Sequence, residues 1–71
     1  MIRPNRVALS QHIVARREEL NMRQIDLARA IGASQQGMEN IEVGRKGVAI
    51  ARLAKIAVAL DMPLDELIEK K

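Results

Sequence analysis

Gly32 divides the middle of the sequence into two short segments with helical periodicity, and this break is the strongest limit on the fold. The segment before the glycine carries its apolar residues on one stripe at helical spacing, namely Leu27, Ala28 and Ile31. A glycine directly after such a stripe can take a positive φ, which ends a helix without steric cost. Ser34 then stands where a hydroxyl can cap the first turn of a second helix. Residues 24–42 are therefore predicted to form two short helices joined by a tight turn.

The second predicted helix has an apolar inner side and a polar outer side. Met38 and Ile41 fall on the inner side together with Glu42. The outer side carries three amides and one carboxylate: Gln35, Gln36, Glu39 and Asn40. An amide offers a donor beside an acceptor, the pattern that matches N6 and N7 of adenine in the major groove of DNA. An ordinary solvated polar face explains the same residues, and the amides taken alone favour it over base reading.

The spacing of Ala28, Gly32, Met38 and Ile41 resembles a helix-turn-helix, in which a small residue allows close approach, a glycine makes the turn and two apolar residues anchor the second helix. The longer stretch M-R-Q-I-D-L-A-R-A-I-G-A-S-Q-Q-G-M-E-N-I-E-V-G-R-K is similar to the Xre/Cro–CI family of bacterial and phage repressors. The resemblance runs without a gap over residues 13–68 and includes the ending I-A-V-A-L-D-M-P-L-D-E-L. It implies an all-α fold, a compact five-helix lambda-repressor-like DNA-binding domain with its helix-turn-helix at the second and third helices.

Length and composition exclude several classes of protein. A chain of 71 residues is limited to one domain, expected to span residues 1–71 with a flexible arm over residues 1–5. Cysteine is absent, which excludes disulfides and thiolate metal sites. Aromatic residues are also absent, so the bases of a single strand would find no ring to stack on. We expect no metal, no cofactor and no enzymatic activity, because the chain has one histidine, no tyrosine and no inward pair of carboxylates.

The net charge of +3 at pH 7 is a modest excess, but its distribution is uneven. Arginines dominate the first half of the chain, whereas acidic residues dominate beyond Leu60. A basic first half suits a polyanionic partner. The longest apolar-rich run, residues 48–60, contains Arg52 and Lys55 and is too short to span a bilayer. No signal-peptide pattern is present, so we expect a cytoplasmic protein.

The resemblance implies roles for particular residues of the two short helices and of the loop behind them. It implies base reading in the major groove by Gln35, Gln36 and Asn40. It implies contacts to the phosphate backbone by Arg23, Gln24, Arg45 and Lys46. Arg23 departs from the family, which usually has a small hydroxyl residue there, so the helix cap should be weaker by about 1 kcal/mol. The same departure places a guanidinium beside a helix N-terminus, where a phosphate would dock.

A first helix is predicted over residues 6–20, with an inward stripe that contains one charge: Leu9, Ile13, Arg17 and Leu20. An inward arginine needs a partner, because an unpaired buried charge is strongly destabilising. The resemblance implies that this partner is Glu42. We therefore predict a largely buried ion pair between Arg17 and Glu42. His12 lies off the stripe and is expected to be solvated.

Two residues of the second short helix depart from the family pattern. Gly37 stands where a small hydroxyl residue is usual, and inside a helix it costs about 1 kcal/mol relative to alanine. It either allows close approach to a base or sugar or has no role in binding. Glu39 faces outward beside the amides, where it can accept from cytosine, repel wrong sites or bond a neighbouring arginine. The last of these interpretations is favoured.

The C-terminal part is predicted to form a helix over residues 49–60 and a last short helix over residues 64–69, which Pro63 opens. This last helix is apolar for its length, so its apolar side chains are expected to be buried against another surface. Packing against Leu60 of the same chain is one explanation. The resemblance implies another, a dimer interface formed by Met62, Leu64, Leu67 and Ile68.

These features, taken with the resemblance, predict a sequence-specific regulator of transcription that binds double-stranded DNA. A repressor that reads the major groove as a homodimer is favoured. The alternative is an antitoxin or another protein-interaction module, in which the same fold binds a protein partner such as a toxin. Gly37, Glu39, the modest net charge and the acidic last helix favour this alternative slightly.

Overall fold

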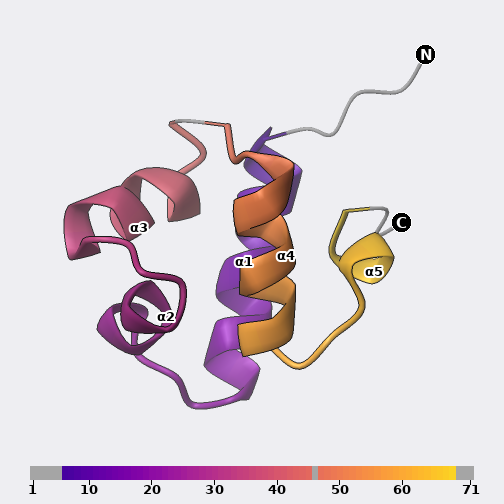
Figure 1. The fold of residues 1–71 in the computed structure, drawn as a ribbon, viewed down its shortest axis with the longest axis horizontal. Coiled ribbons are helices and arrows are strands. Elements are labelled where there is room, and N and C mark those ends of the chain that lie inside the picture. The colour runs from indigo at the N-terminus through magenta and orange to yellow at the C-terminus, as the bar shows by residue number, and fades with distance from the viewer. Residues whose placement is uncertain (1–5, 46, 69–71) are drawn as a thin grey trace.

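The computed structural model describes residues 6–45 and 47–68, with side chains from residue 8 onward. Over this part of the chain the fold consists of helices without strands, as Figure 1 shows. The helices are α1 (Arg6–Glu19), α2 (Gln24–Ala30), α3 (Gln35–Glu42), α4 (Ile50–Ala59) and α5 (Leu64–Ile68). The predicted all-α, five-helix fold is confirmed.

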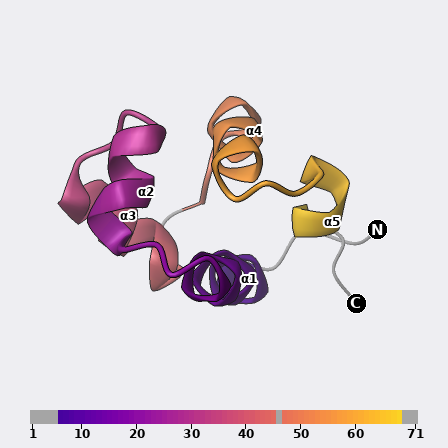
Figure 2. The same ribbon diagram turned by 90° about the horizontal axis from the view of Figure 1, so that it is seen from below.

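The helices are arranged around a core that lies between α1 and α4. These two helices overlap in Figure 1, but the view from below in Figure 2 separates them. In that view α2 and α3 lie on one side of the pair and α5 lies on the other. The two helices of the predicted helix-turn-helix pack against each other, and α3 also contacts α1 while α2 contacts α4. The pair α2–α3 is thus held against the rest of the domain through one face of each helix.

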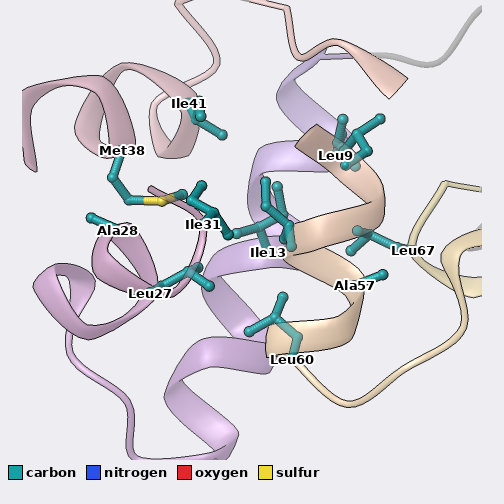
Figure 3. Close-up of a cluster of buried hydrophobic side chains, with 12 residues drawn as sticks. Leu9, Ile13, Leu27, Ala28, Ile31, Met38, Ile41, Ala57, Leu60 and Leu67 are labelled. Atoms are coloured by element: carbon teal, nitrogen blue, oxygen red, sulfur yellow. The ribbon is translucent and has the colours of Figure 1, made fainter. Parts of the chain in front are cut away.

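Side chains from every helix meet in this core, as Figure 3 shows for ten labelled residues. The apolar residues predicted to face inward from the helix-turn-helix are all buried, namely Leu27, Ala28, Ile31, Met38 and Ile41. Leu9 and Ile13 contribute the stripe of α1. The prediction for Leu20 was wrong, because this residue is 38% exposed. The helix ends at Glu19, so Leu20 lies in the following turn and no longer continues the helical stripe.

The turn between α2 and α3 has the geometry that the sequence predicts. Gly32 adopts a φ of 71°, in the left-handed region where a Cβ atom would be strained. The Oγ atom of Ser34 accepts a hydrogen bond from the backbone N–H of Gly37 at 3.0 Å. This bond satisfies one of the free donors at the start of α3. The glycine and the serine thus end one helix and begin the next within a few residues.

The last helix, α5, is part of the core of its own chain. Leu67 is fully buried, and the neighbouring apolar side chains of Met62, Leu64 and Ile68 are partly buried against the same core. Two polar side chains of α1 also reach this end of the molecule. Arg16 donates from Nε to the carbonyl oxygen of Leu60 at 2.9 Å, and Nδ1 of His12 lies 3.3 Å from the carbonyl oxygen of Leu67. His12 is therefore partly buried against α5, whereas full solvation was expected.

Candidate nucleic-acid interface

The inner side of α3 is tied to α1 by an ion pair. Nε of Arg17 lies 2.8 Å from Oε2 of Glu42, and Nη2 donates to Oε1 at 3.1 Å, so the guanidinium binds the carboxylate with two parallel bonds. The side chains are only 14% and 5% exposed. Nη1 of Arg17 also donates to the carbonyl oxygen of Met22 at 2.8 Å. The structure thus brings together the two residues predicted to pair, and it adds a backbone partner that the sequence did not indicate.

The same carboxylate also holds Gln24, one of the residues predicted to contact a phosphate. Nε2 of Gln24 donates to Oε1 of Glu42 at 3.1 Å. Gln24 is the first residue of α2, so its amide lies at the N-terminus of that helix. One N–H of the amide is used by Glu42, and the second remains to donate to a phosphate. Glu42 therefore connects α1, the start of α2 and the end of α3.

The start of α2 is capped in a way that the sequence analysis missed. Oδ2 of Asp26 accepts from the backbone N–H of Arg23 at 3.0 Å and from Nε of the same residue at 3.0 Å, and Nη2 of Arg23 donates to Oδ1 at 2.9 Å. The expected weakening at Arg23 is therefore offset by Asp26. The signal was present, since an acidic residue three positions after the cap forms half of a capping box. Arg23 is exposed, as required for a phosphate contact.

This exposed pair shifts the ionisation of both partners. Hydrogen bonds from the side chain and then from the backbone of Arg23 lower the pKa of Asp26 from 3.8 to about 2. The side-chain bond to Asp26 and the charge of its carboxylate raise the pKa of Arg23 in turn. Each partner thus stabilises the charged form of the other, so Arg23 is held at the helix N-terminus by an ionised neighbour.

The outer side of α3 carries the amides predicted to read bases. Gln35 and Gln36 are exposed, and Asn40 is half-buried. Oδ1 of Asn40 accepts from Nη1 of Arg45 at 2.6 Å and from Nε2 of Gln36 at 3.4 Å. The predicted base-reading amides and one predicted backbone cation therefore share one surface. The other predicted cation of this loop, Lys46, and the arm of residues 1–5 lie outside the described residues.

The structure gives a local reason for a glycine at position 37 that the sequence did not reveal. A Cβ atom at this position would lie 3.2 Å from Oγ of Ser34, which is closer than most such contacts. A larger residue would require the Ser34 hydroxyl that caps α3 to shift by a few tenths of an ångström. Gly37 also lines a hollow of about 290 Å³ between α3 and the start of α4, together with Asn40 and Arg52. Arg52 was not among the predicted site residues.

The part of the chain that the structure describes contains no helix long and apolar enough to cross a membrane. Within the same residues, no group of three or more histidine, aspartate or glutamate side chains is placed to hold a metal ion. The chemistry on the surface of α2 and α3 is instead that of amides, arginines and helix N-termini. These groups form hydrogen bonds to base edges and phosphates in protein–DNA complexes.

Comparisons with known proteins agree with this geometry. A family model described as helix-turn-helix matches residues 13–67. A transcriptional regulator from the ATPase CF(0) region of Rhodospirillum rubrum, itself uncharacterized, is 40% identical over 57 residues, which are 80% of this chain and 53% of that protein. This chain therefore spans about half the length of that relative.

A solved structure is also similar. The crystal structure of the restriction-modification controller protein C.AhdI from Aeromonas hydrophila matches with a TM-score of 0.83 and 27% sequence identity, over 87% of this chain and 94% of that one. The chain thus belongs to the helix-turn-helix family, and within it to the Xre/Cro–CI type.

Proposed function

We propose that this protein is a transcriptional regulator that binds double-stranded DNA in a sequence-specific manner, most readily as a repressor. The observation that carries the proposal is the outer side of α3, where the amide of Asn40 joins Arg45 to the exposed Gln36, while the inner side is fixed to α1 by a buried ion pair. Such a helix presents hydrogen-bonding groups on a rigid support, which direct readout in the major groove requires. The names of the similar proteins, a transcriptional regulator and a controller protein, support the same function.

The residues divide into two groups by the part of DNA that they would contact. Gln35, Gln36 and Asn40 would face base edges, and their contacts would set sequence preference. Arg23, Gln24, Arg45 and Lys46 would face phosphates, and their contacts would set the register on the duplex. The phosphate contacts make the binding constant fall steeply with salt concentration, because bound counterions are released from the duplex.

Selection of binding sites from random duplex, followed by fluorescence anisotropy at fixed salt, tests this function. Gln36→Ala should weaken binding to the selected site by about 1–3 kcal/mol and hardly change binding to random duplex. Gln11→Ala provides a matched control, since Gln11 is an exposed glutamine on α1. Equal losses on selected and random duplex would refute base reading by Gln36. A parent protein without any preferred site would refute the function.

The protein is further proposed to act as a homodimer whose half-sites lie about one helical turn, some 34 Å, apart. The side chains of Leu64 and Ile68 on α5 and of Met62 just before it remain partly exposed and would contact the partner, whereas Leu67 would support them from inside. Sedimentation velocity with Ile68→Lys tests the interface, with Val58→Lys on α4 as control because Val58 is 81% exposed. If only the control variant became monomeric, the interface would lie on α4 instead.

One observation favours the alternative function, a protein-interaction module such as an antitoxin. Val58 borders an open hollow of about 710 Å³ lined mainly by apolar atoms of α2, α4 and the turn at Gly32, with Arg29 and Lys55 beside it. An exposed apolar hollow of this kind suits a protein partner. Gel shifts with and without a co-purified partner separate the two functions. Val58→Lys should abolish co-purification of such a partner and preserve DNA binding.

A further inference from the structure

The hydrogen bonds of Asn40 indicate that this residue has a second task beside the base reading proposed above. Its Oδ1 atom accepts from Nη1 of Arg45 at 2.6 Å and, more weakly, from Nε2 of Gln36 at 3.4 Å. An amide oxygen has two lone pairs, so both acceptor positions of Asn40 are engaged within the protein. Recognition of adenine by asparagine needs this oxygen to accept from N6 of the base. Asn40 keeps only its Nδ2 donors for DNA.

The direction of the three hydrogen-bonding groups follows from Arg45. A guanidinium has donors and no acceptor, so the Asn40 atom that faces it must be the oxygen. The same oxygen then faces Gln36, which must in turn present its Nε2 group rather than its own oxygen. The amide of Gln36 is thereby held with Nε2 toward Asn40 and Oε1 directed away from it. Arg45 thus determines on which side the amide of Gln36 presents its donor and on which side its acceptor.

We propose that Arg45 is a positioning residue for sequence preference, which acts through Asn40 on Gln36. The proposal rests on the function proposed above. Gln36 retains Oε1 and its second N–H, the pair of groups that a glutamine uses to recognise adenine. Without Arg45 the amide of Asn40 can rotate by half a turn and offer Nδ2 to Oε1 of Gln36. The donor and the acceptor that Gln36 presents to the base would then exchange places.

Site selection from random duplex with Arg45→Gln tests this inference. The variant should change the preferred base at the position that Gln36→Ala also changes. It should lose about tenfold more affinity for the parent's selected site than for random duplex, as expected when one base contact is lost. Arg23→Gln is the matched control, because it removes one cation from a predicted phosphate contact and touches neither Asn40 nor Gln36. It should weaken both duplexes by the same factor.

Two substitutions of Asn40 separate positioning from a purely structural effect. Asn40→Asp keeps an oxygen toward Arg45 and toward Gln36, so it should retain the parent's preferred base although its negative charge lowers affinity for every duplex. Asn40→Ala removes the connection and should change the preferred base as Arg45→Gln does. Circular dichroism melting is expected to show that all five variants, Gln36→Ala included, fold.

The outcomes distinguish this inference from the proposed function. If Arg45→Gln selected the parent's site and lost affinity equally on both duplexes, the positioning role would be overturned and the proposed function would stand. A change of base preference in Asn40→Asp as large as that in Asn40→Ala would also overturn the positioning role. If the parent protein selected no site, both proposals would fail together.

Discussion

The two sides of α3 use similar polar groups in opposite settings. On the inner side, Glu42 is almost fully buried and accepts from Arg17 and Gln24 in a network that joins three helices. On the outer side, Asn40 accepts from Gln36 and Arg45 in bonds that water can reach. A buried bond is expensive to break, because the group left behind loses its partner and has no water to replace it. The inner network therefore fixes where α3 lies, whereas under the proposed function the outer network would exchange its partners for DNA.

The largest effect expected from this comparison is that of Glu42→Gln. The substitution leaves the guanidinium of Arg17 buried without a countercharge and should lower the free energy of unfolding by about 3–5 kcal/mol. Urea denaturation followed by circular dichroism measures it. Glu39→Gln on the exposed side of the same helix is the control and should stay within about 0.5 kcal/mol of the parent. A Glu42→Gln variant as stable as the parent would contradict the assigned role of the inner network.

The double variant Arg17→Met with Glu42→Leu tests whether the unpaired charge is the cause of this loss of stability. Replacing both charges by apolar side chains leaves no unpaired charge, so the loss should be much smaller than that of Glu42→Gln alone. The amide of Gln24 would lose its carboxylate partner. Equal losses in the single and double variants would mean that packing, rather than charge pairing, decides stability here.

An intermediate effect is expected at the start of α3, where Ser34 caps the helix. Ser34→Ala removes the hydroxyl that accepts from Gly37 at 3.0 Å and should cost about 1 kcal/mol, the usual cost of a lost helix cap. The change in melting temperature on calorimetry measures it. Ser34→Asp, which retains an acceptor, should restore most of the loss. If Ser34→Ala, like Ser34→Asp, melted at the same temperature as the parent, the cap would contribute nothing to stability.

The smallest effect concerns the exposed pair at the start of α2. The pKa of Asp26 is lowered to about 2 in the folded chain from an ordinary value of 3.8, so its stabilising effect is present above about pH 4 and is lost as the pH falls toward 2. Asp26→Asn should therefore flatten the dependence of the melting temperature on pH between 4 and 2. The difference should be small, because solvent and salt screen an exposed pair. If the melting temperatures of the parent and of Asp26→Asn fell in parallel across this pH range, the lowered pKa of Asp26 would be contradicted.

Buried features were predictable from the sequence, because packing leaves few choices for them. The apolar stripes, the turn at Gly32 and the cap by Ser34 all follow from local spacing and chemistry. The pairing of Arg17 with Glu42 was predicted because an inward charge required a partner and the family resemblance supplied one.

Exposed details were not predictable to the same degree. Asp26 was overlooked as the capping partner of Arg23, although its spacing was suitable. The prediction for Leu20 was wrong because the boundary of α1 moved by one residue. The bond between Arg45 and Asn40 depends on the path of the loop behind α3, which no periodic pattern specifies. Surface side chains have several rotamers of similar energy, and only the fold decides among them.

The burial of Leu67 makes α5 a part of the interior. A protease that cut after Pro63 would remove this side chain from the core, and water would reach surfaces that are dry in the intact molecule. Such a cut should destabilise the helix-turn-helix as well, because buried side chains of α2 and α3 share one core with Leu67. Loss of α5 would therefore unfold the domain as a whole instead of merely shortening it.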